Sequence, residues 1–134
     1  MSILTPEIKA ALKNVQLFPF ATSSSSGIPN VVPVKFIFIE NDKELWIVDN
    51  FMLKTLKNMT QNPHVALYVY DTEKSSCCQI KGTISIQTSG ENYDRMKKTI
   101  HKLLPEAPAK SLVILSITEV YQCMPGEDVG QRIH

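Results

Sequence analysis

The sequence of 134 residues predicts a mainly β protein in which six antiparallel strands close into a small barrel, with three short helices at its periphery. Short turn signals join the apolar runs, and they favour hairpins. The runs show neither a regular βαβ rhythm nor an internal repeat. The clearest alternation lies in residues 79–87, where four apolar or glycine positions face one side and polar residues face the other. Residues 1–134 are therefore expected to form one domain.

The first predicted elements are a helix and a strand. Thr5 supplies an N-cap hydroxyl, Pro6 occupies the first helical position, where a missing N–H costs nothing, and Glu7 places an acid in the first turn. The predicted elements of this part are a helix at residues 6–15, a strand at 18–22 and a serine-rich turn at 23–29.

Residues 30–39 are apolar on both alternating sides, which predicts one long strand covered on two faces. Pro33 cannot donate to a ladder, so at this point the strand lies at an edge, carries a bulge or is left unpaired and open to a ligand. Lys35 projects from the same side as Pro33 and needs solvent or a partner. A hairpin turn at residues 41–43 leads to a strand at residues 44–48.

A short helix is predicted next, because Asp49-Asn50 offers a capping side chain and Asn62-Pro63 stops the chain from continuing as a helix. Its apolar face would consist of Met52, Leu53, Leu56 and Met59. The remaining predicted elements are strands at residues 64–70, 79–87 and 112–121, an amphipathic helix at 91–104 and a tail at 124–134.

Composition excludes several classes of partner. With 14 basic and 13 acidic residues, the net charge of +1 gives no field that suggests a nucleic acid or an anionic membrane. No apolar run is long enough to span a bilayer, and the first ten residues lack the pattern of a secretory signal. The expected location is the cytoplasm.

Common reactive motifs are missing from the sequence. His64, His101 and His134 have no metal-ligand spacing, so no metal site is expected. The three cysteines favour reduced thiols, and the polar residues before Cys77 and Cys78 predict that this adjacent pair lies near the surface. The chain contains no GxSxG, GxGxxG or P-loop pattern.

The segment around Lys54 and Thr55 is the best candidate for ligand binding. If Asn50 caps the helix, the first N–H groups of that helix point outward next to a lysine, and a phosphate would bind well there. A solvated lysine with only a structural role is the alternative that spacing alone leaves open.

Residues 29–71, PNVVPVKFIFIENDKELWIVDNFMLKTLKNMTQNPHVALYVYD, and residues 79–86, QIKGTISI, together resemble the flavin-binding split-barrel family related to pyridoxamine 5′-phosphate oxidase. The order of parts carries the resemblance: a proline-led strand, a hairpin, a strand, a short helix around K-T, then N-P-x-V and a strand with Q-x-x-G. The chain is most similar to the small single-domain FMN-binding members.

The resemblance implies a split barrel that binds FMN at the interface of a homodimer. In the family the phosphate is held near the K-T pair, here Lys54 and Thr55, and a glutamine corresponding to Gln79 reaches the cofactor. The flavin ring would lie along the first strand at Val32, Pro33, Val34 and Lys35, and along the end of the next strand at Val48, Asp49 and Asn50.

The family resemblance predicts an FMN-dependent oxidoreductase that acts on a small substrate or electron donor, without identifying catalytic residues. An FMN-binding electron carrier or storage protein is the alternative, followed by a relative that binds haem or the deazaflavin F420. Larger pyridoxamine phosphate oxidases end in a Trp- and Arg-rich segment, whereas this chain ends in Gly-Gln-Arg-Ile-His, so vitamin B6 oxidation is not expected. The tail at residues 128–134 is expected to cover the flavin of the partner subunit.

Overall fold

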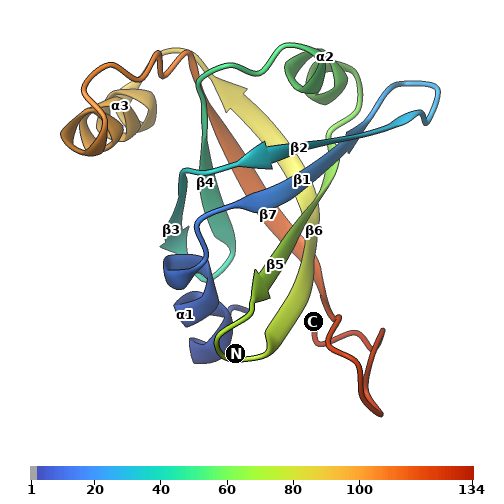
Figure 1. The fold of residues 1–134 in the computed structure, drawn as a ribbon. Coiled ribbons are helices and arrows are strands. Elements are labelled where there is room, and N and C mark those ends of the chain that lie inside the picture. Colours follow the sequence, from blue (N-terminus) through green and yellow to red (C-terminus); the bar gives the residue numbers. More distant parts are fainter. Residues whose placement is uncertain (1–2) are drawn as a thin grey trace.

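Seven strands form one antiparallel sheet that curls into a barrel, and three helices lie around it in the computed structural model, which describes residues 3–134 (Figure 1). This confirms the predicted mainly β fold, with seven strands where six were expected. The elements are α1 (Pro6–Asn14), β1 (Phe18–Ser23), β2 (Pro29–Val34), β3 (Ile37–Asn41), β4 (Glu44–Asp49), α2 (Lys54–Gln61), β5 (His64–Asp71), β6 (Ser76–Gln87), α3 (Glu91–Leu103) and β7 (Ser111–Gln122).

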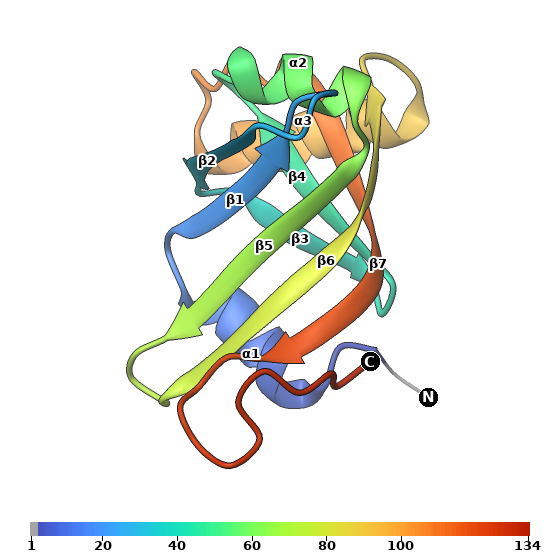
Figure 2. The same ribbon diagram turned by 90° about the vertical axis from the view of Figure 1, so that its right-hand side faces the viewer.

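The barrel is split between β2 and β3, which follow each other in the sequence but form the two edges of the sheet. The strand order is β2-β1-β5-β6-β7-β4-β3, so β2 and β3 end opposite sides of the sheet. Only Lys35 and Phe36 separate these two strands. Within the described residues they do not pair with each other (Figure 2). The Val48 N–H donates to the Phe36 carbonyl at 3.2 Å, which continues the β3–β4 ladder to the residue before β3.

The prediction of one strand over residues 30–39 is therefore wrong. Residues 29–34 pair with β1, whereas residues 37–41 pair with β4, and one straight strand cannot reach both partners. The expected cover on both faces is also wrong for β2, whose outward-facing residues are exposed. The apolar pattern reflects two half-buried edge strands joined by a bend.

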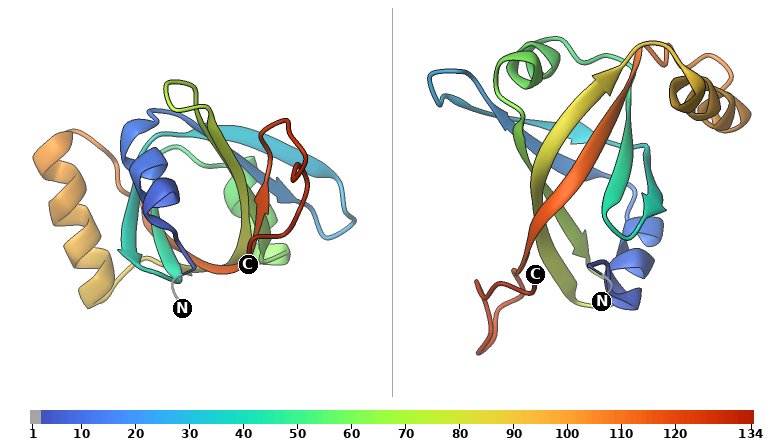
Figure 3. Two further views of the ribbon diagram at one scale, coloured as in Figure 1. Left: turned by 90° about the horizontal axis from the view of Figure 1, so that it is seen from below. Right: turned by 180° about the vertical axis from the view of Figure 1, so that it is seen from behind.

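The main core fills the barrel, and α1 closes one end of it (Figure 3). The Thr5 side chain caps α1 by accepting a hydrogen bond from the Ile8 N–H at 3.2 Å, as the sequence predicts. Buried side chains from six strands, all except β3, meet the buried face of α1 here. Fully buried members of this core include Leu4, Phe18, Phe20, Leu45, Ile47, Leu67, Val69, Ile80 and Leu115.

A second apolar cluster holds α3 against the outer surface of β4 and β7. Met96 and Ile100 of α3 pack against Trp46, Val48 and Leu112, among others. Val48 belongs to this cluster and also reaches the candidate site described below. The position of α3 is thus coupled by packing to the end of β4.

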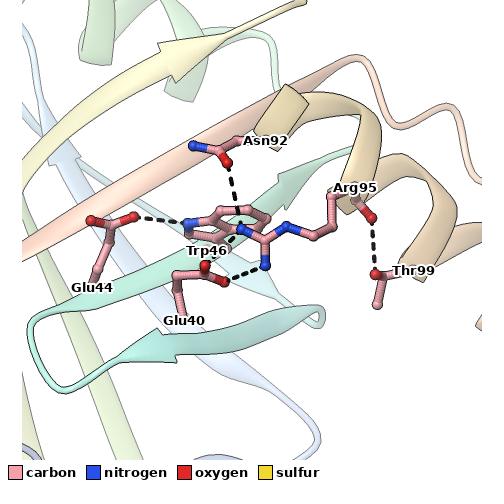
Figure 4. Close-up of polar contacts among 6 residues, drawn as sticks. All are labelled: Glu40, Glu44, Trp46, Asn92, Arg95 and Thr99. Carbon is pink, nitrogen blue, oxygen red and sulfur yellow. Dashed lines mark hydrogen bonds and ion pairs between the residues drawn. The ribbon is translucent and has the colours of Figure 1, made fainter. Parts of the chain in front are cut away.

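Arg95 strengthens this contact through two interactions that Figure 4 shows. Its guanidinium lies 4.3 Å from the ring centre of Trp46 and donates to both carboxylate oxygens of Glu40, at 3.0 and 2.7 Å. The hydrogen bond with Glu40 raises the pKa of Arg95 further. Trp46 donates from its indole nitrogen to Glu44 at 3.0 Å, so its polar atom is satisfied although the residue is buried.

Gly82 marks an irregularity where β6 crosses β7. The register shifts between Lys81 and Gly82, and a β-carbon at position 82 would meet the backbone oxygen of Ser116 and the side chain of Leu115. Since both obstacles belong to a paired, buried strand, the close approach of β6 and β7 requires glycine here.

Gly82→Ala is expected to lower the free energy of unfolding by about 1–3 kcal/mol, because the added methyl group forces two paired strands apart. Urea denaturation followed by circular dichroism measures this difference. Ser85→Ala, at an exposed position of the same strand, is the matched control. Equal free energies of unfolding for the two variants would show that β7 can move to admit the methyl group without loss of stability.

Candidate functional site

A cavity of about 670 Å³ opens at the split of the barrel, which is within the range of small-molecule sites. The edge of β2 forms one wall and the end of β4 another. The connection between β4 and α2 and the start of α2 complete it, together with one residue from the end of α3. The lining residues are Val32, Pro33, Val34, Lys35, Phe36, Val48, Asn50, Phe51, Met52, Leu53, Lys54, Thr55 and Leu104.

The edge of β2 presents free backbone groups to this cavity. Pro33 is paired with Pro19, and β2 has β1 as its neighbour on one side and lies at the sheet edge on the other. Of the alternatives for Pro33, the edge position is therefore the observed one. Because neither proline has an N–H, this pair cannot be a hydrogen-bonded pair, so the Pro33 carbonyl points away from β1 toward the open edge.

Asp49 shapes the connection between β4 and α2 from a fully buried position. Its carboxylate accepts hydrogen bonds from the Ser111 hydroxyl at 2.8 Å and from the Met52 N–H at 2.9 Å. Lys110 Nζ lies 3.8 Å from the same carboxylate and donates to the Met52 carbonyl at 3.0 Å. These bonds fold residues 50–53 into a fixed loop at the cavity rim.

The helix α2 starts later than its predicted cap implies. It begins at Lys54, Leu53 is its N-cap residue, and no side chain accepts from its first N–H groups. Asn50 does not cap it, because the Asn50 Oδ1 atom accepts instead from the Ala109 N–H at 2.8 Å. Lys54 and Thr55 are thus the first two residues of the helix, and both line the cavity.

A chain of polar side chains fixes the start of α2 against the β1–β2 hairpin. The Asn30 amide donates to the hydroxyls of Thr22 and Thr55, at 3.2 and 3.0 Å, and the Asn58 amide donates to Thr22 at 3.1 Å. Thr55 is 2% exposed, and since its oxygen accepts from Asn30, its hydroxyl hydrogen is available to a ligand. The helix N-terminus is held rigidly at the cavity.

The charged side chains that line the cavity are all positive. Lys35 and Lys54 line it, and no acidic side chain is among the described lining residues. The Lys35 ammonium lies 5.9 Å from the ring centre of Phe36. The partial positive charge of the α2 N-terminus adds to these cations, so this cavity favours an anionic group.

The structure brings together eight of the ten residues that the sequence nominated. Asp49 and Gln79 do not line the cavity: Asp49 supports the rim from within, and Gln79 lies on β6 between Tyr68 of β5 and Tyr121 of β7. The lining residues that sequence reasoning did not nominate are Phe36, Phe51, Met52, Leu53 and Leu104.

Some of these five lining residues could have been recognised from their chemistry and position, and others could not. Phe51 and Leu53 are 83% and 85% exposed, and such large apolar side chains next to a predicted cap indicate a binding rim. The prediction had instead placed Leu53 on the buried face of the helix, which is wrong. Leu104 follows α3, more than fifty positions later in the chain, and no sequence spacing indicated its approach to the rim.

The cysteines differ from expectation in their burial. All three are free thiols, but Cys77 and Cys78 are 4% and 5% exposed, so the predicted surface position of the pair is wrong. The polar loop ends at Ser75, and both cysteines already belong to β6, opposite Tyr70 and Val69. Burial raises the pKa of Cys78 to about 12, and a hydrogen bond with Cys77 raises the pKa of Tyr68 to about 12.

Residues 3–134 contain neither a cluster of metal-ligating side chains nor a membrane-spanning helix. No cluster of three or more His, Cys, Asp or Glu side chains could hold a metal ion there. None of the described helices is both long and apolar enough to cross a membrane.

The C-terminal tail packs on its own chain. The Gln122 N–H donates to the Gln131 carbonyl at 2.9 Å, the Ile133 N–H donates to the Val120 carbonyl at 2.7 Å, and Arg132 pairs with Glu119 at 3.3 Å. These bonds extend the sheet beside the end of β7. The tail lies at the opposite end of the barrel from α2, so it does not approach this chain's own cavity (Figure 1).

The fold and the cavity define a split-barrel domain with a cavity of small-molecule size at the split. The chain belongs to the pyridoxamine 5′-phosphate oxidase family, whose model matches residues 4–124. The uncharacterized protein MJ0282 of Methanocaldococcus jannaschii is 38% identical over 133 residues, which are 97% of this chain and 87% of that protein.

Solved structures agree with this assignment. HupZ of Group A Streptococcus is 27% identical with a TM-score of 0.81, over 94% of this chain and 98% of that one. HutZ, the haem storage protein of Vibrio cholerae, is 16% identical with a TM-score of 0.69, over 89% of this chain and 94% of that one. An FMN-binding protein of Syntrophomonas wolfei is 16% identical with a TM-score of 0.66, over 82% and 78%. The last two show the fold alone.

The buried thiols give a prediction for chemical modification. At neutral pH, native protein should react with a thiol reagent at Cys123, which is partly exposed, well before Cys78. Folded Cys78 keeps its proton up to a pH of about 12, whereas unfolded Cys78 releases it near its usual pKa of 9.0. The stability that the buried, protonated thiol gives the folded state is therefore lost as pH rises between these values. Mass spectrometry of labelled peptides measures the order, and unfolded protein should label at all three sites. Rapid native labelling of Cys78 would contradict its burial.

Proposed function

We propose that this protein is an FMN-binding flavoprotein that acts as an FMN-dependent oxidoreductase on a small substrate or electron donor. The observation that carries the proposal is the uncapped N-terminus of α2, which brings Lys54 and Thr55 into a mainly apolar cavity. A phosphate and a planar ring are the two parts of FMN that such a site can hold.

The cavity residues fit these two parts. At the phosphate end, the first N–H groups of α2, the Lys54 ammonium and the Thr55 hydroxyl are all donors. At the ring end, Val32, Val34 and Val48 offer flat apolar contact. The Pro33 carbonyl at the free edge is an acceptor for a ring N–H, as expected from a strand that leaves its backbone unpaired.

When bound, FMN supplies the redox chemistry, by accepting and releasing a hydride or single electrons. The chain's own contribution is to bind, orient and tune. Lysines are the only titratable side chains among the described lining residues, so no carboxylate, imidazole or thiol is placed there as a general acid or base. Lys35 would stabilise negative charge on the ring, and the apolar walls would limit access of water.

We also propose that two chains form the working unit. β2, β1, β5 and β6 lie side by side in the sheet (Figure 2). Val31, Tyr68 and Tyr70 of these strands are exposed, and Gln79 lies directly opposite Tyr68 on the neighbouring strand. A cavity open on one side and edged by exposed Phe51 and Leu53 is incomplete for a cofactor that must be covered. In a homodimer, Gln79 of one subunit would reach the FMN of the other, which accounts for its distance from this chain's own cavity.

The alternatives are a non-enzymatic FMN carrier, a haem-binding protein and an F420-binding protein. A non-enzymatic FMN carrier would use the same site, and only turnover separates it from an oxidoreductase. Haem is bound by HutZ, as its name states, but the described lining of this cavity includes Met52 and no histidine, cysteine or tyrosine as an axial ligand. The phosphate-binding end favours FMN over haem.

The absorption spectrum of the purified protein tests the cofactor. A flavin spectrum, with FMN released on denaturation, is the expected result, and a colourless preparation that takes up no added FMN would contradict it.

Stopped-flow reduction of the loaded protein by NADH or NADPH then separates enzyme from carrier. Saturable reduction with turnover supports the oxidoreductase, whereas its absence with tight FMN binding supports the carrier.

Lys54→Ala should weaken FMN about tenfold and leave riboflavin binding almost unchanged, because the lysine interacts with the phosphate. Fluorescence titration of the cofactor-free protein with each flavin gives both dissociation constants. Lys57→Ala is the matched control, since Lys57 is an exposed lysine of the same helix that does not line the cavity. Equal weakening of FMN and riboflavin binding would show that Lys54 contacts a part of the ligand other than the phosphate.

A further inference from the structure

Ala109 adopts a conformation that is unusual for alanine. It is fully buried and has a φ of 44°, in the left-handed region that disfavours a side chain. Both of its backbone polar groups are engaged by side chains: its N–H donates to Asn50 Oδ1 at 2.8 Å, and its carbonyl accepts from the Tyr93 hydroxyl at 2.9 Å. A strained residue thus links α3 to the cavity rim.

The link determines which way the Asn50 amide faces. A backbone N–H can only donate, so the Asn50 atom that meets it must be the oxygen, and the amide nitrogen lies on the other side. This nitrogen has no hydrogen-bond partner among residues 3–134. Since every buried side-chain nitrogen and oxygen in that part of the chain has a partner, the Asn50 nitrogen is not buried. Because Asn50 lines the cavity, its two N–H groups are available to a ligand there.

Neighbouring bonds keep this arrangement rigid. The Lys110 N–H donates to the Asp49 carbonyl at 2.8 Å, and the Lys110 and Ser111 side chains bond the same loop. On the other side, Tyr93 packs against the cluster of α3 and β4. The amide therefore cannot turn over without breaking the bond to Ala109.

We propose that Asn50 is a ligand-binding donor and that Tyr93 is its positioning residue, acting through Ala109. The inference rests on the proposed function, and it assigns the Asn50 N–H groups to an acceptor oxygen or nitrogen of the flavin ring. Lys54 and Thr55 bind the phosphate instead. A donor at the ring stabilises the added negative charge of the reduced flavin, so Asn50 raises the reduction potential.

Asn50→Asp separates the two functions of this side chain. An aspartate still accepts from the Ala109 N–H, but it offers the cavity a carboxylate in place of two donors. FMN and riboflavin should both bind at least about tenfold more weakly, in contrast to Lys54→Ala, because the lost contact is to the ring. The potential of the bound flavin should fall, and its affinity should recover at low pH, where a protonated aspartate can donate.

Tyr93→Phe tests the positioning role. It keeps the ring in the apolar cluster and removes the hydroxyl that holds Ala109. Both flavins should bind about threefold to fivefold more weakly with a lower potential, and amide hydrogen exchange at Ala109 should be faster in the cofactor-free protein. Thr99→Val is the control, because Thr99 also donates a hydroxyl to a backbone carbonyl of α3 at 2.9 Å, on its exposed side. It should change none of these quantities.

The outcomes distinguish this inference from the proposal on which it rests. Wild-type protein that takes up no flavin would overturn the proposed function, and the role of Asn50 with it. If wild-type protein binds FMN but Asn50→Asp keeps its affinity and potential, the donor role of Asn50 is wrong. If Tyr93→Phe behaves like Thr99→Val in exchange and potential, Tyr93 is only a packing residue.

Discussion

The passage from β2 to β3 in two residues is the constraint on which the rest of this structure depends. Lys35 and Phe36 carry the chain from one edge of the sheet to the other without making a hairpin, and the two edge strands do not pair with each other within the described residues. The barrel therefore remains open at this point. An open edge normally invites aggregation, and here the β4–α2 loop and the start of α2 lie opposite it. The cavity is the space between that edge and these segments.

The polar groups of the site are positioned by residues that lie far from it in the sequence. Asn30 holds Thr55 from the β1–β2 hairpin, and Ala109 holds Asn50 from the connection before β7. In both cases one hydrogen bond fixes which atom faces the cavity. Because buried polar groups must be satisfied, each of these contacts also belongs to the stability of the fold. Binding geometry and folding are thus determined by the same bonds.

Local patterns predicted much of this architecture. The Thr5 cap, the alternation in β6 and the stop at Asn62-Pro63 are features that neighbouring residues determine, and the structure contains all of them. The split of residues 30–39 could not be predicted in this way, since the apolar pattern of two edge strands is the same as that of one central strand. The predicted role of Asn50 as a helix cap is wrong for a related reason. A cap is the local use of an asparagine, whereas its observed partner, Ala109, is known only from the tertiary fold.

The fold alone does not determine which ligand a protein of this kind binds. HupZ, HutZ and the FMN-binding protein share this fold, although the names of the last two refer to different ligands. A barrel that stays open at one edge can accommodate any flat molecule of suitable size. Selection among such molecules has to come from groups at the edge of the opening. In this chain the opening ends at an uncapped helix with Lys54 and Thr55, and these donors are the groups that the proposed function assigns to a phosphate, which FMN carries and riboflavin lacks. In the proposed function, the ring end, with its apolar walls, the Pro33 carbonyl and the Asn50 amide, would then distinguish a flavin from other phosphorylated molecules.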